Sequence, residues 1–169
     1  LFTDINESNI DLFKEQVPSS EFVGVDDIYD VNCDIYAPCA LGATVNDKTI
    51  DRLKCKIVAG AANNQLAEPR HGDILKEKNI LYAPDYLINA GGLMNVSIEF
   101  EGWSDDKATR MVDTIYDTTM NVFKISDEEN VPVYKATDLL AEKRIEAIRG
   151  IQGGYLGHLP HRFPGRKIR

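Results

Sequence analysis

The chain has 169 residues, of which 43% are apolar and 27% charged, and this composition excludes a disordered polymer and supports one packed core. Its formal net charge of −8 argues against non-specific nucleic-acid binding, because that activity requires lysine and arginine to neutralise phosphates. No apolar run approaches the roughly 18 residues of a membrane helix, and no secretion signal opens the chain. We therefore expect a globular domain that binds neither nucleic acid nor membrane.

The first two thirds of the chain alternate short apolar segments with helical ones. Residues 1–4 have the pattern of a strand, and Asn6 or Ser8 can cap a helix that runs to about Gln16. The further strands are expected at residues 22–25, 33–37, 55–61 and 80–83, with helices at 46–54 and 68–78. Such alternation predicts an α/β fold of the doubly wound type, with a parallel sheet.

The last third is expected to be helical. Apolar residues recur at helical spacing from Ser104, and a further helix is expected to start at Thr137 or Asp138. The apolar stripes of these long amphipathic helices indicate a core or a subunit interface, so we expect a homo-oligomer. The end of the chain is basic and is expected to face solvent or a partner.

Cysteines and histidines are too few and too scattered to indicate a disulfide framework or a metal site. Cys33, Cys39 and Cys55 have no Cys-x-x-Cys spacing and lie in no recognisable nucleophile motif, so no catalytic thiol is expected. The histidines are expected to face solvent. Unpaired thiols fit a reducing compartment, and we expect a cytoplasmic location.

Ligands of open α/β sheets bind beyond the carboxyl ends of the strands, which directs attention to the residues after each strand. Asp4 follows the first strand, where a carboxylate can accept hydrogen bonds from ribose hydroxyls, although such an Asp also commonly serves in a turn or a helix cap. Small residues at 38–42 would let backbone groups approach a ligand closely.

Two further junctions carry carboxamides and glycines. Asn63 and Asn64 each offer a donor and an acceptor, as a nicotinamide carboxamide or a substrate carboxylate requires, although two neighbouring asparagines can also form only a turn. In residues 86–96, paired glycines would bring backbone N–H groups at a helix start close to a ligand. Leu93 and Val96 are three residues apart and would face the same side.

No phosphate-binding glycine motif, neither G-x-G-x-x-G nor G-x-x-x-x-G-K-[ST], occurs in the chain. Nevertheless, five segments taken together resemble the amino-acid dehydrogenases that act on Glu, Leu, Phe and Val, and the members that act on leucine are the most similar. These segments are residues 3–6, 33–43, 58–66, 70–72 and 82–92. The resemblance extends to about residue 149.

The resemblance implies an incomplete Rossmann-like dinucleotide-binding domain at residues 1–103, C-terminal helices at 104–149 that pack on it or on another subunit, and a basic tail at 150–169. In this family, a preceding domain carries a catalytic Lys and Asp, and a glycine-rich turn precedes the strand that ends at Asp4. The chain begins with Leu1 rather than Met. We therefore expect the C-terminal, NAD-binding half of such an enzyme, without catalytic residues of its own and inactive alone.

The resemblance also assigns site residues. It implies that Asp4 binds the adenosine ribose and that Asn63 and Asn89 approach the nicotinamide. Residues Cys39, Ala40 and Leu41 are expected to lie along the NAD cofactor.

The substrate side of the site is assigned to Asn64, Leu93 and Val96, although which of the two neighbouring asparagines meets the nicotinamide stays open. Two aliphatic side chains favour a branched-chain amino acid, and a leucine at position 93 should disfavour phenylalanine.

The expected activity is the NAD-dependent oxidative deamination of a branched-chain L-amino acid, leucine-like, to the 2-oxo acid and ammonium. Two alternatives remain. One is a non-catalytic nucleotide-binding or oligomerisation module, and the other is an NADP-linked glutamate enzyme. The charge of Asp4 opposes the second, because it would repel the 2′-phosphate of NADP.

Overall fold

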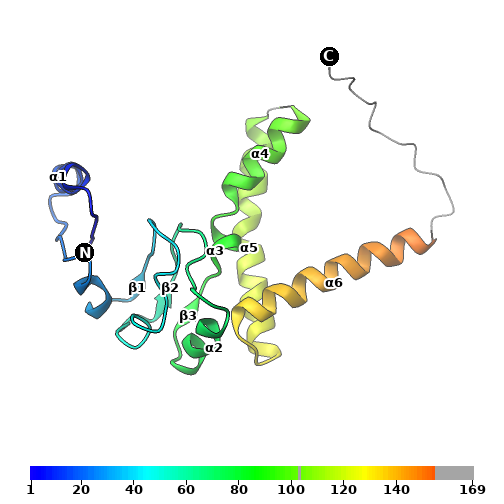
Figure 1. The fold of residues 1–169 in the computed structure, drawn as a ribbon. Helices are drawn as coiled ribbons and strands as arrows, with labels where there is room; N and C mark the ends of the chain where they lie inside the picture. Colours follow the sequence, from blue (N-terminus) through cyan, green and yellow to red (C-terminus); the bar gives the residue numbers. More distant parts are fainter. Residues whose placement is uncertain (103, 155–169) are drawn as a thin grey trace, which may run out of the picture.

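The computed structural model describes residues 1–102 and 104–154, and Figure 1 shows its elements in chain order. The helices are α1 (Glu7–Gln16), the 3₁₀ helix η1 (Asp27–Asp30), α2 (Arg70–Glu77), α3 (Asp85–Ile88), α4 (Gly91–Glu101), α5 (Asp105–Glu128) and α6 (Val133–Gly154). The strands are β1 (Ile35–Tyr36), β2 (Ile57–Val58) and β3 (Leu81–Tyr82). None of the described helices is long and apolar enough to cross a membrane.

The three strands form a parallel sheet in the order β1-β2-β3, which confirms the α/β class expected from the sequence. Ile35 lies opposite Ile57, and Ile57 lies opposite Leu81. Because all three strands run in the same direction, their carboxyl ends meet at one edge of the sheet, where ligands of such folds bind. The loops that follow β1, β2 and β3 therefore define the edge to examine for a site.

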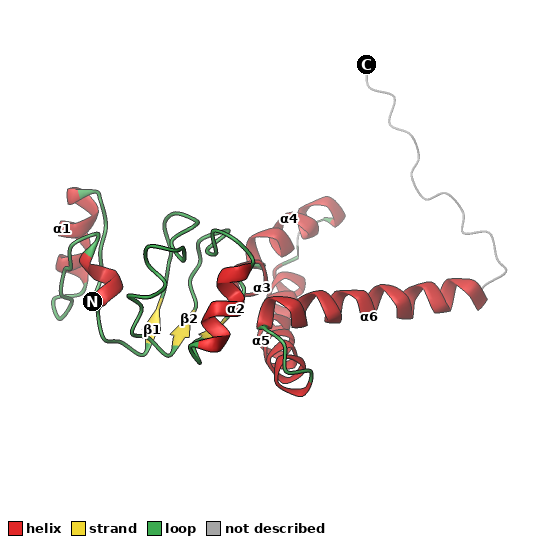
Figure 2. Cartoon of the chain, turned by 60° about the horizontal axis from the view of Figure 1, so that its bottom comes forward, coloured by secondary structure: helices red, strands yellow, loops and turns green. Residues whose placement is uncertain are grey.

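The core lies around this sheet, with a second apolar cluster among the terminal helices. Eight apolar residues are buried in the sheet cluster, and they are Val45, Ile50, Leu53, Cys55, Val58, Leu75, Ile80 and Tyr82. Val122 and Ile125 of α5 pack with Ala136 of α6 in the second cluster. In both views α1 lies at one end of the molecule, beyond β1, whereas α4, α5 and α6 lie at the other (Figures 1 and 2).

The N-terminal segment forms a small unit of its own. The strands expected at 1–4 and 22–25 are reduced to one parallel bridge between Phe2 and Phe22. The Phe2 ring packs 4.5 Å from the Phe13 ring of α1, measured between ring centroids. The helix itself starts as expected, because the Asn6 side chain accepts the N–H of Ser8 at 2.9 Å.

The helix expected at residues 46–54 is wrong, since this segment forms consecutive turns. The Asn46 side chain accepts the N–H of Lys48 at 2.9 Å, and the Thr49 hydroxyl donates to the Thr44 carbonyl at 2.6 Å. The Asn46 contact is of the N-cap kind, and the Ile50 N–H also donates to the Asn46 carbonyl. The turns do not continue because Lys54 pairs with Asn32 in a parallel bridge, so strand pairing competes with the helix. Apolar spacing alone did not reveal this competition.

The terminal helices follow the sequence expectation, with one shifted boundary. A helix begins after Ser104 as expected, and the Ser104 side chain caps it by accepting the Lys107 N–H. The helix expected from Thr137 or Asp138 starts earlier, at Val133, where the Ala136 N–H donates to the Pro132 carbonyl at 3.1 Å. Proline is favourable at a helix start because no N–H is needed there. Residues 150–154 of the expected basic tail belong to α6, and residues 155–169 lie outside the described part of the chain.

Candidate functional site

A cavity of about 540 Å³ opens where the loops after β2 and β3 meet helices α3 and α4. It brings together five of the residues assigned to the site from the sequence. Its lining consists of Asn63, Asn64, Asp85, Tyr86, Asn89, Ala90, Gly92, Leu93 and Val96. One side is thus rich in carboxamides, whereas α4 contributes two aliphatic side chains.

The carboxamides of Asn63 and Asn89 form a directional pair. The Asn89 amide donates to the Asn63 side-chain oxygen at 2.6 Å and to the Ala61 carbonyl at 3.2 Å. These bonds use the acceptor of Asn63 and the donor of Asn89. Within the described residues, the Asn63 amide and the Asn89 side-chain oxygen have no other partner, and they form the donor and acceptor pair that another carboxamide requires.

A buried glutamine holds the loop that carries these asparagines. Gln65 is fully buried, and its amide donates to the carbonyls of Gly60 at 2.5 Å and Ala62 at 3.0 Å. The loop returns to the sheet edge through the Ala62 N–H, which donates to the Pro38 carbonyl at 2.9 Å. The turn after β2 is therefore fixed from inside the protein, which leaves Asn63 and Asn64 exposed at its tip.

Asp85 is a lining residue that the sequence analysis did not single out. Its carboxylate is buried and accepts the backbone N–H of Asn64 and the hydroxyl of Tyr82, both at 2.7 Å. Burial and then the hydrogen bond to Asp85 raise the pKa of Tyr82, so the phenol stays protonated and donates. In the sequence, an Asp after Pro84 indicates only a helix start. Its contact with Asn64 could not be foreseen, because Asn64 is 21 residues away along the chain.

The aliphatic wall of the cavity is formed by α4. Leu93 is 76% exposed and Val96 is 46% exposed, and both line the cavity, as their spacing of three residues predicts. The paired glycines occupy the first turn of α4 rather than a loop before it. A Cβ at Gly92 would meet nothing within 4 Å, so packing does not require a glycine at this position.

The other residues assigned to a cofactor lie outside this cavity. The Asp4 carboxylate accepts the Asn6 N–H at 2.8 Å and the Asn9 amide at 3.4 Å. The Asn6 N–H lowers the pKa of Asp4. Cys39, Ala40 and Leu41 are exposed in the loop after β1.

That loop is nevertheless joined to the cavity through the segment that follows it. The Ala43 N–H donates to the Asn64 carbonyl at 2.7 Å, and the Val45 N–H donates to the Gln65 carbonyl at 3.0 Å. A Cβ at Gly42 would lie 2.6 Å from the Asn63 carbonyl oxygen, so only glycine allows this close approach. The loops after β1 and β2 therefore form one packed surface.

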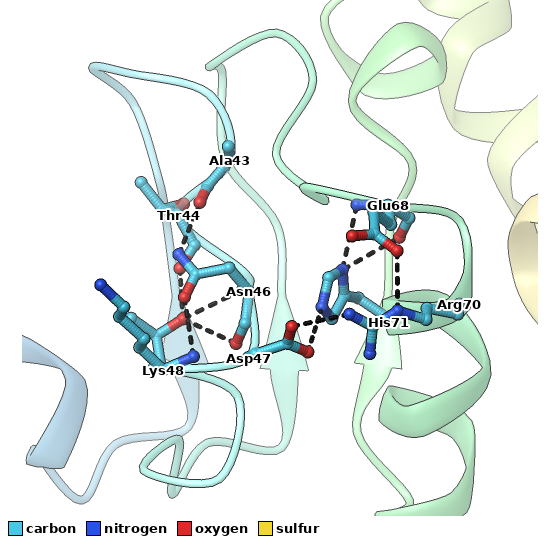
Figure 3. Close-up of polar contacts among 9 residues, drawn as sticks. Ala43, Thr44, Asn46, Asp47, Lys48, Glu68, Arg70 and His71 are labelled. Atoms are coloured by element: carbon cyan, nitrogen blue, oxygen red, sulfur yellow. Dashed lines mark hydrogen bonds and ion pairs between the residues drawn. The ribbon is translucent and has the colours of Figure 1, made fainter.

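A polar network holds the same segment against the start of α2 (Figure 3). The Asp47 carboxylate contacts Arg70 at 2.7 Å and the Nε2 atom of His71 at 3.1 Å. The Nδ1 atom of His71 accepts the Glu68 N–H at 3.0 Å, and Arg70 also pairs with the Glu68 carboxylate at 2.7 Å. His71 is 1% exposed, so the expectation that it faces solvent is wrong. The ring can be buried because both of its nitrogens have protein partners. The other two histidines, His158 and His161, lie outside the described residues.

This network predicts a defined acid sensitivity. Hydrogen bonds from Arg70 and then His71 lower the pKa of Asp47 from 3.8 to about 2. Because the folded-state pKa lies below the unfolded one, the ionised carboxylate stabilises the fold above about pH 4, and this contribution is lost as the pH falls toward about 2. Asp47→Asn should therefore lose less of its unfolding free energy over this range than the wild type does. Urea unfolding at a series of pH values measures the difference.

The matched control for this prediction is Asp11→Asn, which removes an exposed carboxylate of α1. The control should keep the wild-type dependence of stability on pH. Equal pH dependence in the wild type and in Asp47→Asn would contradict the prediction.

Comparisons with known proteins agree with the architecture. Residues 3–153 match the Glutamate/Leucine/Phenylalanine/Valine dehydrogenase family. Leucine dehydrogenase of Thermoactinomyces intermedius is 53% identical over 92% of this chain and 42% of its own length. Leucine dehydrogenase of Geobacillus stearothermophilus is 46% identical over 100% of this chain and 46% of its own length. The chain thus spans less than half the length of these relatives.

A solved structure resembles the fold closely. The L-tryptophan dehydrogenase of Nostoc punctiforme superposes with a TM-score of 0.83 at 42% identity, over 86% of this chain and 43% of that protein. The sequence match covers both the loops that line the cavity and the helices that follow them. The chain therefore belongs to the Glutamate/Leucine/Phenylalanine/Valine dehydrogenase family.

Proposed function

We propose that this chain supplies much of the NAD site and part of the substrate pocket for the oxidative deamination of a branched-chain L-amino acid, leucine-like, to its 2-oxo acid and ammonium. The observation that carries this proposal is the cavity in which a directional carboxamide pair faces the aliphatic side chains of Leu93 and Val96. Membership of the family supports it, as do relatives whose names specify leucine.

The free donor and acceptor of the Asn63–Asn89 pair fit a nicotinamide carboxamide. When bound, NAD supplies the acceptor for the hydride that leaves the α-carbon of the amino acid. The pair would hold the nicotinamide through its carboxamide and so limit the orientations open to the ring. Asp4 is proposed to accept a ribose hydroxyl through the oxygen whose contact with Asn9 is a long 3.4 Å. Cys39, Ala40 and Leu41 are proposed to lie along the dinucleotide.

The substrate is proposed to bind on the α4 side of the cavity. Leu93 and Val96 would contact its branched side chain and exclude water from it, while Asn64 would bind its polar end. Asp85 accepts two hydrogen bonds already, and we assign it no proton transfer. Proton transfer is assigned to groups outside this chain, which alone should show no turnover.

A cytoplasmic homo-oligomer is part of the proposal. The cysteines are free thiols, which suits a reducing compartment. Val112, Tyr116 and Met120 of α5 are exposed apolar side chains, and such a stripe suits a contact between subunits.

The test uses the complete gene product, by which we mean the polypeptide encoded by the whole reading frame that contains this chain. We expect it to form NADH with leucine faster than with phenylalanine or glutamate, and to use NAD in preference to NADP, as measured by NADH absorbance. The 169-residue chain is assayed beside it and should show no turnover. Faster oxidation of glutamate would contradict the pocket assignment, and absence of turnover with any amino acid would favour a non-catalytic nucleotide-binding module.

A further inference from the structure

Asp85 lines the cavity and connects strand β3 with the loop after β2. It is the first residue of α3 and is 6% exposed, and both of its carboxylate oxygens are engaged. One oxygen accepts the Tyr82 hydroxyl from the end of β3, and the other accepts the Asn64 N–H from the loop after β2. A buried carboxylate is costly unless such donors satisfy it, so its presence here indicates a specific task.

Its partner Asn64 has an unusual backbone conformation. The φ angle of Asn64 is 53°, in the left-handed region, which non-glycine residues adopt only at some cost in free energy. Its N–H donates to a carboxylate oxygen of Asp85 at the short distance of 2.7 Å. Asparagine tolerates this region better than other non-glycine residues, and Asp85 is placed to hold Asn64 in it.

The direction of the Asn64 side chain depends on this conformation. The Asn64 backbone is engaged at both ends, with its N–H bonded to Asp85 and its carbonyl accepting the Ala43 N–H at 2.7 Å. Asn64 itself lines the cavity, and no hydrogen bond of its side chain is found among the described residues. The backbone anchor thus aims a carboxamide whose own donors and acceptor are left for a ligand.

Asp85 also links Asn64 to the second carboxamide of the cavity. The Asn89 N–H donates to the Asp85 carbonyl at 2.8 Å, which closes the single turn of α3. The Asn89 side chain then returns to Asn63 at 2.6 Å. The loop after β2 is consequently held at both ends of α3, through Asn64 to Asp85 at its start and through Asn63 to Asn89 just after its end.

We propose that Asp85 is a positioning residue of the dehydrogenase site, which fixes the left-handed backbone of Asn64 so that its carboxamide faces the bound amino acid. This inference rests on the proposed function. Asp85 itself touches neither cofactor nor substrate in this assignment and acts through Asn64. A carboxylate suits the position because its two oxygens accept from two donors that come from different elements.

The kinetic test is a double-mutant cycle in the complete gene product. Asp85→Ala is expected to lower kcat/KM for leucine by about 30-fold, because loss of alignment at a reacting site is costly. Glycine adopts positive φ freely, and Asn64→Gly also removes the carboxamide that Asp85 aims. In that background, Asp85→Ala should lower kcat/KM by no more than about threefold, since residues that act through one another are not additive.

Two further variants separate positioning from general damage. Asp85→Asn should stay within about threefold of the wild type, because its oxygen can still accept the Asn64 N–H while its amide faces the Tyr82 oxygen. The matched control is Asp73→Asn, since Asp73 also accepts a tyrosine hydroxyl, that of Tyr134 at 3.0 Å, but lies on α2 outside the cavity lining. Asp73→Asn should leave kcat/KM unchanged.

Amide hydrogen exchange, followed by mass spectrometry, tests the anchor without relying on activity. Peptides that cover residues 60–66 should exchange faster in Asp85→Ala than in the wild type, and at the wild-type rate in Asp73→Asn. Unchanged exchange in Asp85→Ala, or equal losses of kcat/KM in both backgrounds of the cycle, would overturn the proposal. If the wild-type enzyme oxidised no amino acid, the proposed function would fail, and the exchange result would still decide whether Asp85 holds Asn64.

Discussion

Gly60→Ala is expected to destabilise the protein by about 3 kcal/mol or more, as overpacking against an immovable neighbour does. A Cβ at this position would lie 2.5 Å from the Pro38 nitrogen and closer still to the Pro38 carbonyl oxygen. These atoms are backbone, so no side-chain rotation relieves the clash. The same carbonyl oxygen accepts the Ala62 N–H at 2.9 Å, and pushing it away would also break that bond. Urea unfolding of the complete gene product measures the loss.

Gly92→Ala is the matched control, because a Cβ there would meet nothing within 4 Å. Gly92 lies in the first turn of α4, so alanine should stabilise the helix by less than the roughly 1 kcal/mol of an interior position. If Gly60→Ala were as stable as the wild type, the close approach of the two loops would be wrong. If Gly60→Ala failed to fold at all, its soluble yield beside that of Gly92→Ala would still reveal the difference.

Asn89→Ala is expected to lower kcat/KM for leucine by about 100-fold, the scale of losing one orienting or charge-stabilising group in an active site. The substitution removes the donor to the Asn63 oxygen and to the Ala61 carbonyl, at 2.6 and 3.2 Å. Asn63 is then free to rotate, so both members of the pair lose their direction. The measurement is the steady-state rate of NADH formation, with circular dichroism to verify that the variant is folded.

Asn95→Ala is a suitable control, since Asn95 lies on α4 but does not belong to the cavity lining. Its kcat/KM should stay near the wild-type value. Retention of full activity by Asn89→Ala would exclude the carboxamide pair from the site. Equal losses in the two variants would instead indicate a general effect of altering the segment around α3 and α4.

The elements that were predicted well depend on local chemistry. Asn6 caps α1, and this was expected because an N-cap side chain bonds backbone N–H groups only two or three residues away. The strands are less well predicted. The apolar run at 55–61 indicates burial, but only Ile57 and Val58 pair with neighbouring strands, because pairing depends on what lies beside them.

The parts of the site that the sequence did not reveal are those built from distant partners. The pocket asparagines were found because their side-chain chemistry is visible in the chain itself. Asp85 and His71 were missed, since their partners Asn64 and Asp47 are 21 and 24 residues away. A buried polar residue is recognisable from sequence only when the fold that satisfies it is already known.

The hydrogen bonds that shape the cavity have a consequence for the order of folding. Those that link Asn64 to Asp85, Asn63 to Asn89 and Asn89 to Ala61 span 21, 26 and 28 residues. By contrast, the bonds from Tyr134 and Lys135 to Asp73 span 61 and 62 residues. Closing a longer loop costs more chain entropy, and non-local contacts form more slowly. The cavity can therefore assemble first, and the docking of α6 onto α2 is expected to be the late step in folding.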